Sequence, residues 1–215
     1  MSLFKSKIFK KINIKRKKYF IMKQNFFDQL DGGWGEIIAD TYKYAETTTL
    51  DYDIDEEGKK YISFGQHKKK LKDSVIVPEG VLYIDYGAFS YCKIKKVILP
   101  KSLKFISNKA FAYCDTLEFV EFNEGLETIG FQAFSCCDNL KRADFPQTLI
   151  NIKPYAFEFA GLEGEITIPE SVKKIGTHAF SLCNKLTKIY VKEDNANLRW
   201  DKDWNAVCPA KIIYY

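Results

Sequence analysis

An Ala-Phe dipeptide recurs five times at nearly constant intervals, and this recurrence limits the possible folds of the 215-residue chain more than any other feature. Successive copies are separated by 22, 23, 23 and 23 residues. A fixed period of this length is the signature of a repeat protein, in which each repeat packs mainly on its neighbours. The copies are Ala88-Phe89, Ala110-Phe111, Ala133-Phe134, Ala156-Phe157 and Ala179-Phe180. We therefore expect a solenoid.

Alignment on the phenylalanine brings other positions into register. The position five residues earlier always holds isoleucine, and the position three residues later holds cysteine in four of the five copies. The isoleucine column is Ile84, Ile106, Ile129, Ile152 and Ile175. The cysteine column is Cys92, Cys114, Cys137, Ala160 and Cys183. Because equivalent residues of a solenoid lie above one another, each column predicts one layer of a continuous core.

Each repeat also contains a short apolar alternation that is typical of a β-strand. Side chains alternate across a strand, so each apolar pair should point inward and the residue between its members outward. A proline follows most of the pairs and should end the strand, because it lacks the N–H that a ladder needs. The pairs are Val75/Val77, Val97/Leu99, Val120/Phe122, Ala143/Phe145, Ile166/Ile168 and Ile189/Val191. These pairs predict one parallel sheet.

The pattern resembles the BspA-like leucine-rich-repeat family, of the Treponema pallidum type. Segments such as Val77-Pro-Glu-Gly-Val81 and Ile175-Gly-Thr-His-Ala-Phe-Ser-Leu-Cys183 carry the resemblance, which covers residues 75–191. It implies an α/β-type repeat solenoid, a right-handed superhelix with one short parallel strand per turn of about 23 residues. It also implies a non-catalytic binding protein, since members of this family are mostly binding proteins and many take part in adhesion at cell surfaces.

The ends of the repeat array suggest caps, because an open hydrophobic end must be covered. Residues 25–74 are expected to form an N-terminal capping region, with a β-hairpin made by residues 47–54 and 60–64 around an acidic, glycine-containing turn. Residues 192–215 are expected to form a C-terminal cap, in which Trp200 and Trp204 cover the last turn. Ile212 and Tyr214 lie 23 residues beyond Ile189 and Val191, which predicts one more strand.

The formal charge of +5 divides unevenly along the chain. Residues 1–23 hold nine of the 33 Lys and Arg residues and no Asp or Glu, so the remainder has 24 basic and 28 acidic residues. Residues 1–24 are therefore predicted to be a basic arm. It would bind an anionic membrane surface or nucleic acid, or be a solvated tail, or be absent if translation begins at Met22. Its central charges are Lys10, Lys11, Lys15, Arg16, Lys17 and Lys18.

Two absences suggest a cytoplasmic protein, although unconventional export stays open. No run of about 18 apolar residues exists to span a membrane. The four apolar residues 19–22, which follow the basic residues 15–18, are too few to form the core of a secretory signal.

No set of residues indicates catalysis, so we expect neither an enzyme nor a cofactor or metal site. The column cysteines are best explained as small core residues, since they lack the paired spacing of zinc ligands. His67 lies in a basic run, and His178 is expected to be exposed at a variable position, with nothing to orient it as in a catalytic triad. The carboxylates of residues 51–57 lack the order of an EF-hand loop.

The outward positions of the predicted sheet are the candidate binding surface for another protein. Ile76, Ile98 and Phe119 should form an apolar patch near the N-terminal end, where apolar side chains on a surface suggest a contact. The alternative is that the hairpin or the N-terminal segment covers them. Charged and aromatic positions continue this face, namely Glu121, Arg142, Asp144, Lys188 and Tyr190. The favoured function is a protein-interaction module. The alternatives are a membrane or nucleic-acid binder that uses the basic arm, and a surface adhesin or exported effector.

Overall fold

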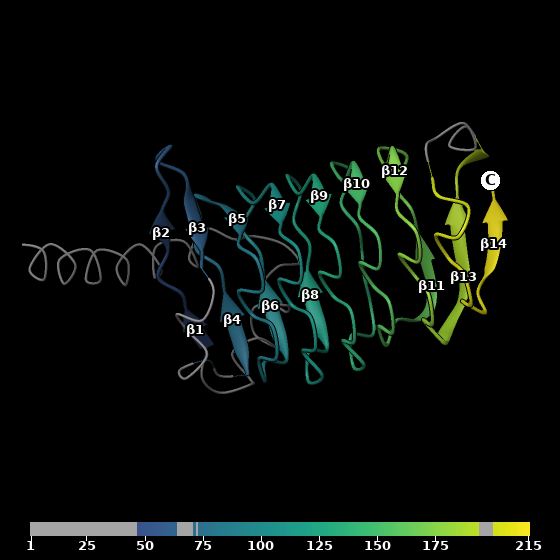
Figure 1. The fold of residues 1–215 in the computed structure, drawn as a ribbon, viewed down its shortest axis with the longest axis horizontal. Coiled ribbons are helices and arrows are strands. Elements are labelled where there is room, and N and C mark those ends of the chain that lie inside the picture. The colour runs from purple at the N-terminus through teal and green to yellow at the C-terminus, as the bar shows by residue number, and fades with distance from the viewer. Residues whose placement is uncertain (1–46, 64–70, 72, 194–199) are drawn as a thin grey trace, which may run out of the picture. The chain divides into compact units, whose positions relative to one another are not determined.

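The computed structural model describes residues 47–63, 71, 73–193 and 200–215, and they form a β-solenoid (Figure 1). All of them belong to the larger of two compact units, Tyr44–Tyr215. The segments that connect the strands are turns, and no α-helix occurs in these ranges. The repeat solenoid predicted from the Ala-Phe spacing is therefore confirmed.

Most turns of the solenoid contribute strands to two faces, which we call the front and the back. The front face has two separate parallel sheets, an N-terminal and a C-terminal front sheet. The N-terminal front sheet has the order β1 (Thr47–Thr49), β4 (Ser74–Ile76), β6 (Lys96–Ile98) and β8 (Phe119–Glu121). The C-terminal front sheet has the order β11 (Glu163–Thr167), β13 (Lys185–Val191) and β14 (Lys211–Tyr214).

The back face is one seven-stranded sheet, which the sequence prediction missed. Its order is β12 (Lys174–Ile175), β10 (Asn151–Ile152), β9 (Thr128–Ile129), β7 (Phe105–Ile106), β5 (Val81–Ile84), β3 (Lys60–Ile62) and β2 (Asp53–Ile54). The column isoleucines were predicted only as core residues, but each also lies at the inward position of a back strand and is at most 1% exposed. The prediction of one strand per turn is thus corrected to two.

The five phenylalanines form one continuous buried stack through the centre of the solenoid. Consecutive ring centroids lie 4.9, 5.0, 5.2 and 5.3 Å apart, and the rings are nearly parallel. All five side chains are completely buried. The backbone N–H of Phe157 donates to the carbonyl of Ala179 in the next turn, and Phe111 does the same to Ala133. The stack and these hydrogen bonds hold neighbouring turns in register.

One predicted strand does not form. Residues 143–145 join no ladder, so the front face is interrupted between β8 and β11. Both inward residues are still buried, Ala143 at 4% and Phe145 at 9% exposure. Ala143 is smaller than the Val or Ile at this position in the other turns, and Phe145 is larger than most of its equivalents. The core therefore holds the backbone differently at this turn, and the inward pattern survives without the strand.

A close approach of two backbones links the turns on either side of this interruption. The Gly161 N–H donates to the carbonyl of Cys137 at 3.0 Å. A Cβ atom added to Gly161 would lie 2.0 Å from the carbonyl oxygen of Asp138. Only glycine fits at this contact.

The strands at the two ends of the solenoid pair as the sequence predicted, with one difference in the hairpin. β2 and β3 pair antiparallel around the acidic turn, and β2 is the outermost strand of the back sheet. The earlier part of the predicted first strand, β1, instead pairs parallel with β4 in the front sheet. At the other end, Trp204 packs edge-on against Phe180 with centroids 5.9 Å apart, and β14 pairs with β13.

Among the described residues, no helix is long and apolar enough to cross a membrane.

Candidate interaction surfaces

The front sheet brings two residues of the predicted apolar patch into direct contact. The parallel register places Ile76 beside Ile98 on the neighbouring strand, and Lys96 beside Phe119. Phe119 therefore lies diagonally from Ile98, in the adjacent outward column. All three apolar side chains are half-buried, and the Lys96 ammonium lies 5.2 Å from the centre of the Phe119 ring. The patch exists, but one lysine lies along its edge.

A half-buried carboxylate borders this patch. Glu121 lies beside Ile98 in the ladder between β6 and β8. Burial raises the pKa of its carboxyl group, and the nearby Lys96 ammonium only partly offsets this effect. A carboxylate that is already partly desolvated costs less to bury further when a partner with a hydrogen-bond donor covers it.

The next two predicted site residues lie where the front face is interrupted. The Arg142 guanidinium and the Asp144 carboxylate are 3.5 Å apart, and their side chains are 70% and 73% exposed. An exposed pair of this kind contributes little to stability. Because no ladder fixes their backbone, these two residues do not continue the regular columns of β4, β6 and β8.

Lys188 and Tyr190 meet a carboxylate that the sequence prediction left out of the site. Glu165 on β11 accepts hydrogen bonds from the Lys188 ammonium at 2.5 Å and from the Tyr190 hydroxyl at 3.0 Å. These bonds lower the pKa of Glu165 and raise that of Lys188. The position of Glu165 in the same outward column as Lys188 was visible in the sequence, but the contact depends on their rotamers.

The column cysteines have a repeated structural role. The Cys114, Cys137 and Cys183 thiols each lie about 3 Å from the carbonyl oxygen of the phenylalanine in the preceding turn. Burial raises the pKa of the Cys137 and Cys183 thiols. A thiol with a raised pKa is a poor nucleophile and a poor metal ligand at neutral pH. Their interpretation as core residues is consistent with this geometry.

The structure describes one of the two histidines and does not describe the basic arm. His178, which was expected to be exposed, is half-buried because its ring stacks on Tyr155 with centroids 5.2 Å apart. Where side chains are described, no group of three or more His, Cys, Asp or Glu residues could hold a metal ion. His67 and the basic arm, with Lys10, Lys11, Lys15, Arg16, Lys17 and Lys18, lie outside the described residues.

The outer surface of the back sheet carries an aromatic row that the sequence prediction missed. Tyr61, Tyr83 and Phe105 are neighbours in the ladder of β3, β5 and β7. The Tyr61 and Tyr83 rings are stacked at 4.9 Å, and Phe105 is 46% exposed. The signal was present, because Tyr83 and Phe105 each directly precede a column isoleucine and must point away from the core.

Comparison with known proteins agrees with this geometry. A model of the BspA-type leucine-rich-repeat region matches residues 62–200 in six copies. The solenoid is similar to the crystal structure of a leucine-rich-repeat protein from T. pallidum, with 28% identity and a TM-score of 0.61 over 66% of this chain and 68% of the other. It is also similar to a leucine-rich cell-surface protein from Faecalibacterium prausnitzii, with 19% identity and a TM-score of 0.58, over 76% of this chain and 52% of that one. No curated protein sequence is significantly similar to the chain.

Proposed function

Because the chain belongs to the BspA-type leucine-rich-repeat family, we propose that it is a non-catalytic module that binds a protein partner on its N-terminal front sheet. Repeats of this family are typical of protein-interaction modules. The observation that carries the proposal is the pairing of Ile76 with Ile98 on adjacent strands, beside Phe119 and a half-buried Glu121.

The fold does not require apolar side chains at these outward positions. The equivalent positions in later turns hold Glu165, Thr167 and Lys188, and those turns have the same buried columns. Apolar surface that adds nothing to the core is a common mark of a binding site. Ile and Phe side chains beside a charged rim also match the usual anatomy of a protein interface.

A site-directed photo-cross-linker tests the proposed face directly. A photoreactive amino acid placed at Ile98 should form covalent adducts with a partner protein in a lysate of the native host, identified by mass spectrometry. The same group placed at Lys173, exposed on the back of the solenoid, is the matched control. Capture of the same proteins in equal yield from both positions would contradict the proposal.

A charge-bearing triple variant gives an independent measurement. Ile76→Lys, Ile98→Lys and Phe119→Glu together should abolish capture of the cross-linked partner, because each change places a charge in an apolar contact. Circular dichroism and the melting temperature should stay close to those of the wild type, since no inward residue changes. Unchanged capture by a folded triple variant would remove this face from consideration.

A second candidate function rests on the basic arm. Nine basic residues without an acidic one in residues 1–23 favour an anionic membrane surface or a nucleic acid as the partner. Deletion of residues 1–21 should then abolish sedimentation with phosphatidylserine vesicles or retention on RNA, while front-face cross-linking is unaffected. Binding that survives the deletion would assign it to another part of the chain.

The site of action in the cell is a separate proposal. We infer a cytoplasmic protein because none of its six cysteines forms a disulfide, as is usual in a reducing compartment, with a surface adhesin or an exported effector as the alternative. Cell fractionation of the native host with an antibody to the solenoid distinguishes the three, because only an exported or surface protein is accessible to added protease in intact cells or found in the medium.

A further inference from the structure

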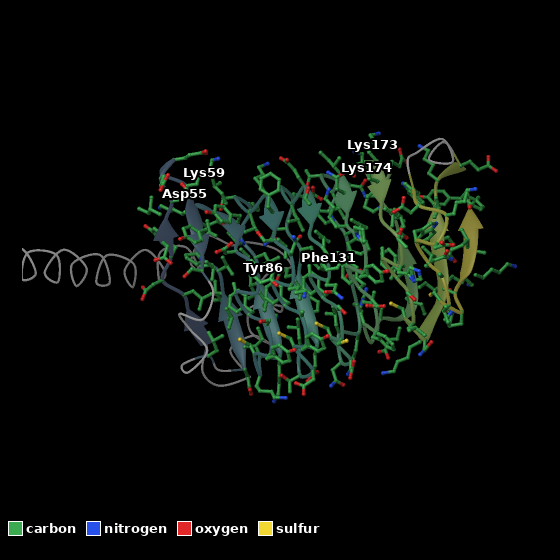
Figure 2. The ribbon with its side chains drawn as sticks, in the orientation of Figure 1. Asp55, Lys59, Tyr86, Phe131, Lys173 and Lys174 are labelled. Carbon is green, nitrogen blue, oxygen red and sulfur yellow. The ribbon has the colours of Figure 1, made fainter. Side chains whose placement is uncertain are left out.

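We propose that the groove beside the turn between β2 and β3 binds an arginine side chain from an extended segment of a partner protein. The groove lies against the outer surface of the back sheet and measures about 430 Å³. It is separate from the front-face site proposed above, so either assignment can fail without the other. Figure 2 shows Asp55 and Lys59 together at this end of the solenoid.

The floor of the groove is aromatic. Tyr83 and Phe105 line it from adjacent strands, and Tyr61 stacks behind Tyr83. Phe105 is 46% exposed, so part of its ring is open to a ligand. The later turns hold Thr128, Asn151 and Lys174 at the same ladder position. The fold therefore accepts polar residues there, and the aromatic row needs a reason other than stability.

The wall of the groove carries an excess of negative charge. Its two lysines each pair with another carboxylate, Lys59 with Glu57 and Lys104 with Glu127 at 3.0 Å. Asp55 and Glu56 complete the acidic wall, and Asp55 is also attracted by the Lys59 ammonium. With Glu57, three carboxylates line the groove against two ammonium groups. The groove thus retains a net negative charge.

The acidic wall is held in a fixed position. The Asp55 carboxylate accepts hydrogen bonds from the Lys59 amide at 2.8 Å, the Glu57 amide at 3.0 Å and the Tyr83 hydroxyl at 3.0 Å. Desolvation opposes the ionisation of Asp55, but these bonds outweigh it and lower the pKa of its carboxyl group. Tyr83 therefore joins the aromatic floor to the carboxylate wall, and the charge is present at neutral pH.

Arginine is the side chain whose chemistry fits both surfaces. A guanidinium group stacks flat on an aromatic ring and at the same time donates a fork of hydrogen bonds to carboxylates. Nucleic acids and anionic membranes would be repelled by the same wall. A second depression of about 330 Å³ shares Phe105 and continues along the back sheet towards Thr128 and Lys153. The binding surface extends beyond one side chain, which favours a peptide segment over a free amino acid.

Nuclear magnetic resonance with a defined probe tests this site on the full-length chain. The probe is the peptide acetyl-Gly-Arg-Gly-amide, and its control contains citrulline, which is neutral and nearly the same shape as arginine. The arginine peptide should shift the amide resonances of residues 55–59, 83 and 105 and bind about five- to tenfold more tightly than the citrulline peptide. Equal binding of the two peptides, or shifts confined to other residues, would overturn the proposal.

Two variants and a matched control locate the interaction. Phe105→Ala and Glu56→Gln should each weaken binding of the arginine peptide by about five- to tenfold, because they remove the stacking ring and one carboxylate. Phe159→Ala removes a ring that is 47% exposed on a different part of the surface and should leave the affinity unchanged. Wild-type affinity in the Phe105→Ala variant would show that the groove does not bind arginine.

Discussion

The N-terminal and C-terminal front sheets have the same interior and different outer surfaces. In the N-terminal sheet, Ile76 and Ile98 form an outward apolar pair, whereas Glu165, Lys188 and Tyr190 of the C-terminal sheet bond to one another. The apolar pairs beneath β4, β6, β8, β11 and β13 are all buried. The difference shows that the fold determines the inward columns and leaves the outward side chains free for function.

The junction between these sheets shows what keeps the solenoid continuous. No ladder crosses residues 143–145, yet the phenylalanine stack passes beneath them without a gap, and β9, β10 and β12 continue on the back. The two halves are therefore joined by the stack and the back sheet, so changes at the junction should affect stability most.

The largest expected effect is at the centre of the stack. Phe134→Ala leaves a cavity between Phe111 and Phe157 and should reduce the free energy of unfolding by about 3–5 kcal/mol. Phe159→Ala, which removes an exposed ring in the next turn, should change it by about 0.5 kcal/mol or less. Urea denaturation followed by circular dichroism measures both. Similar losses in the two variants would mean that the stack does not join the halves.

A smaller loss is expected at the close approach beside the junction. Gly161→Ala places a methyl group against the Asp138 carbonyl and should destabilise the protein by about 1–3 kcal/mol. Gly164→Ala is the control, because its Cβ meets no atom within 4 Å and only the backbone angle φ of +74° is unfavourable. That change should cost about 1 kcal/mol, the penalty of a Cβ atom in a left-handed backbone conformation. Thermal melts that rank Gly164→Ala as the more damaging change would contradict the importance of this contact.

The smallest effect concerns pH and the Glu165–Lys188 pair of the C-terminal sheet. The pKa of Glu165 is lowered in the folded state, so its contribution is present above the ordinary carboxyl pKa and is lost as pH falls through the folded value. The pKa of Lys188 is raised, so its contribution is lost only as pH rises beyond the ordinary lysine value.

Removal of the carboxyl group checks this linkage. Glu165→Gln should remove the part of the stability loss between about pH 5 and pH 3 that comes from this carboxyl group. That part should be small, because water screens the exposed groups. Urea midpoints across this range measure it, with Asp144→Asn as the matched control in the junction. A pH profile identical to that of the wild type would assign no role to the Glu165 bonds.

The inward columns could be predicted because burial repeats the same demand in every turn. Five phenylalanines at spacings of 22 or 23 residues predicted the stack, and Ile212 and Tyr214 correctly predicted the final strand beside Ile189 and Val191. The back strands of the repeats, β5, β7, β9, β10 and β12, were missed because most are only two residues long, too short to show an alternation. The absent strand at Ala143 depends on how neighbouring large and small side chains share the core, which no single column reveals.

The outer surfaces were less predictable, because their contacts join residues from different turns through rotamers and not through periodicity. The pairing of Ile76 with Ile98 followed from the repeat length, but the Lys96 ammonium beside Phe119 did not. The groove was missed for a related reason. The acidic turn alone predicts only a polar hairpin turn. Tyr83 and Phe105, which complete the groove, lie about 25 to 50 residues further along the chain.

The hydrogen bonds of the stacked phenylalanines have a direction along the solenoid. Each donor lies in one turn and its acceptor in the turn that follows. The last of these donors, the Phe180 N–H, donates to the carbonyl of Trp204. Truncation from the carboxyl end would consequently leave one backbone donor after another without its acceptor. Fraying would then advance towards the amino end one turn at a time. The Trp204 carbonyl therefore ends this series of hydrogen bonds at the carboxyl side of the stack.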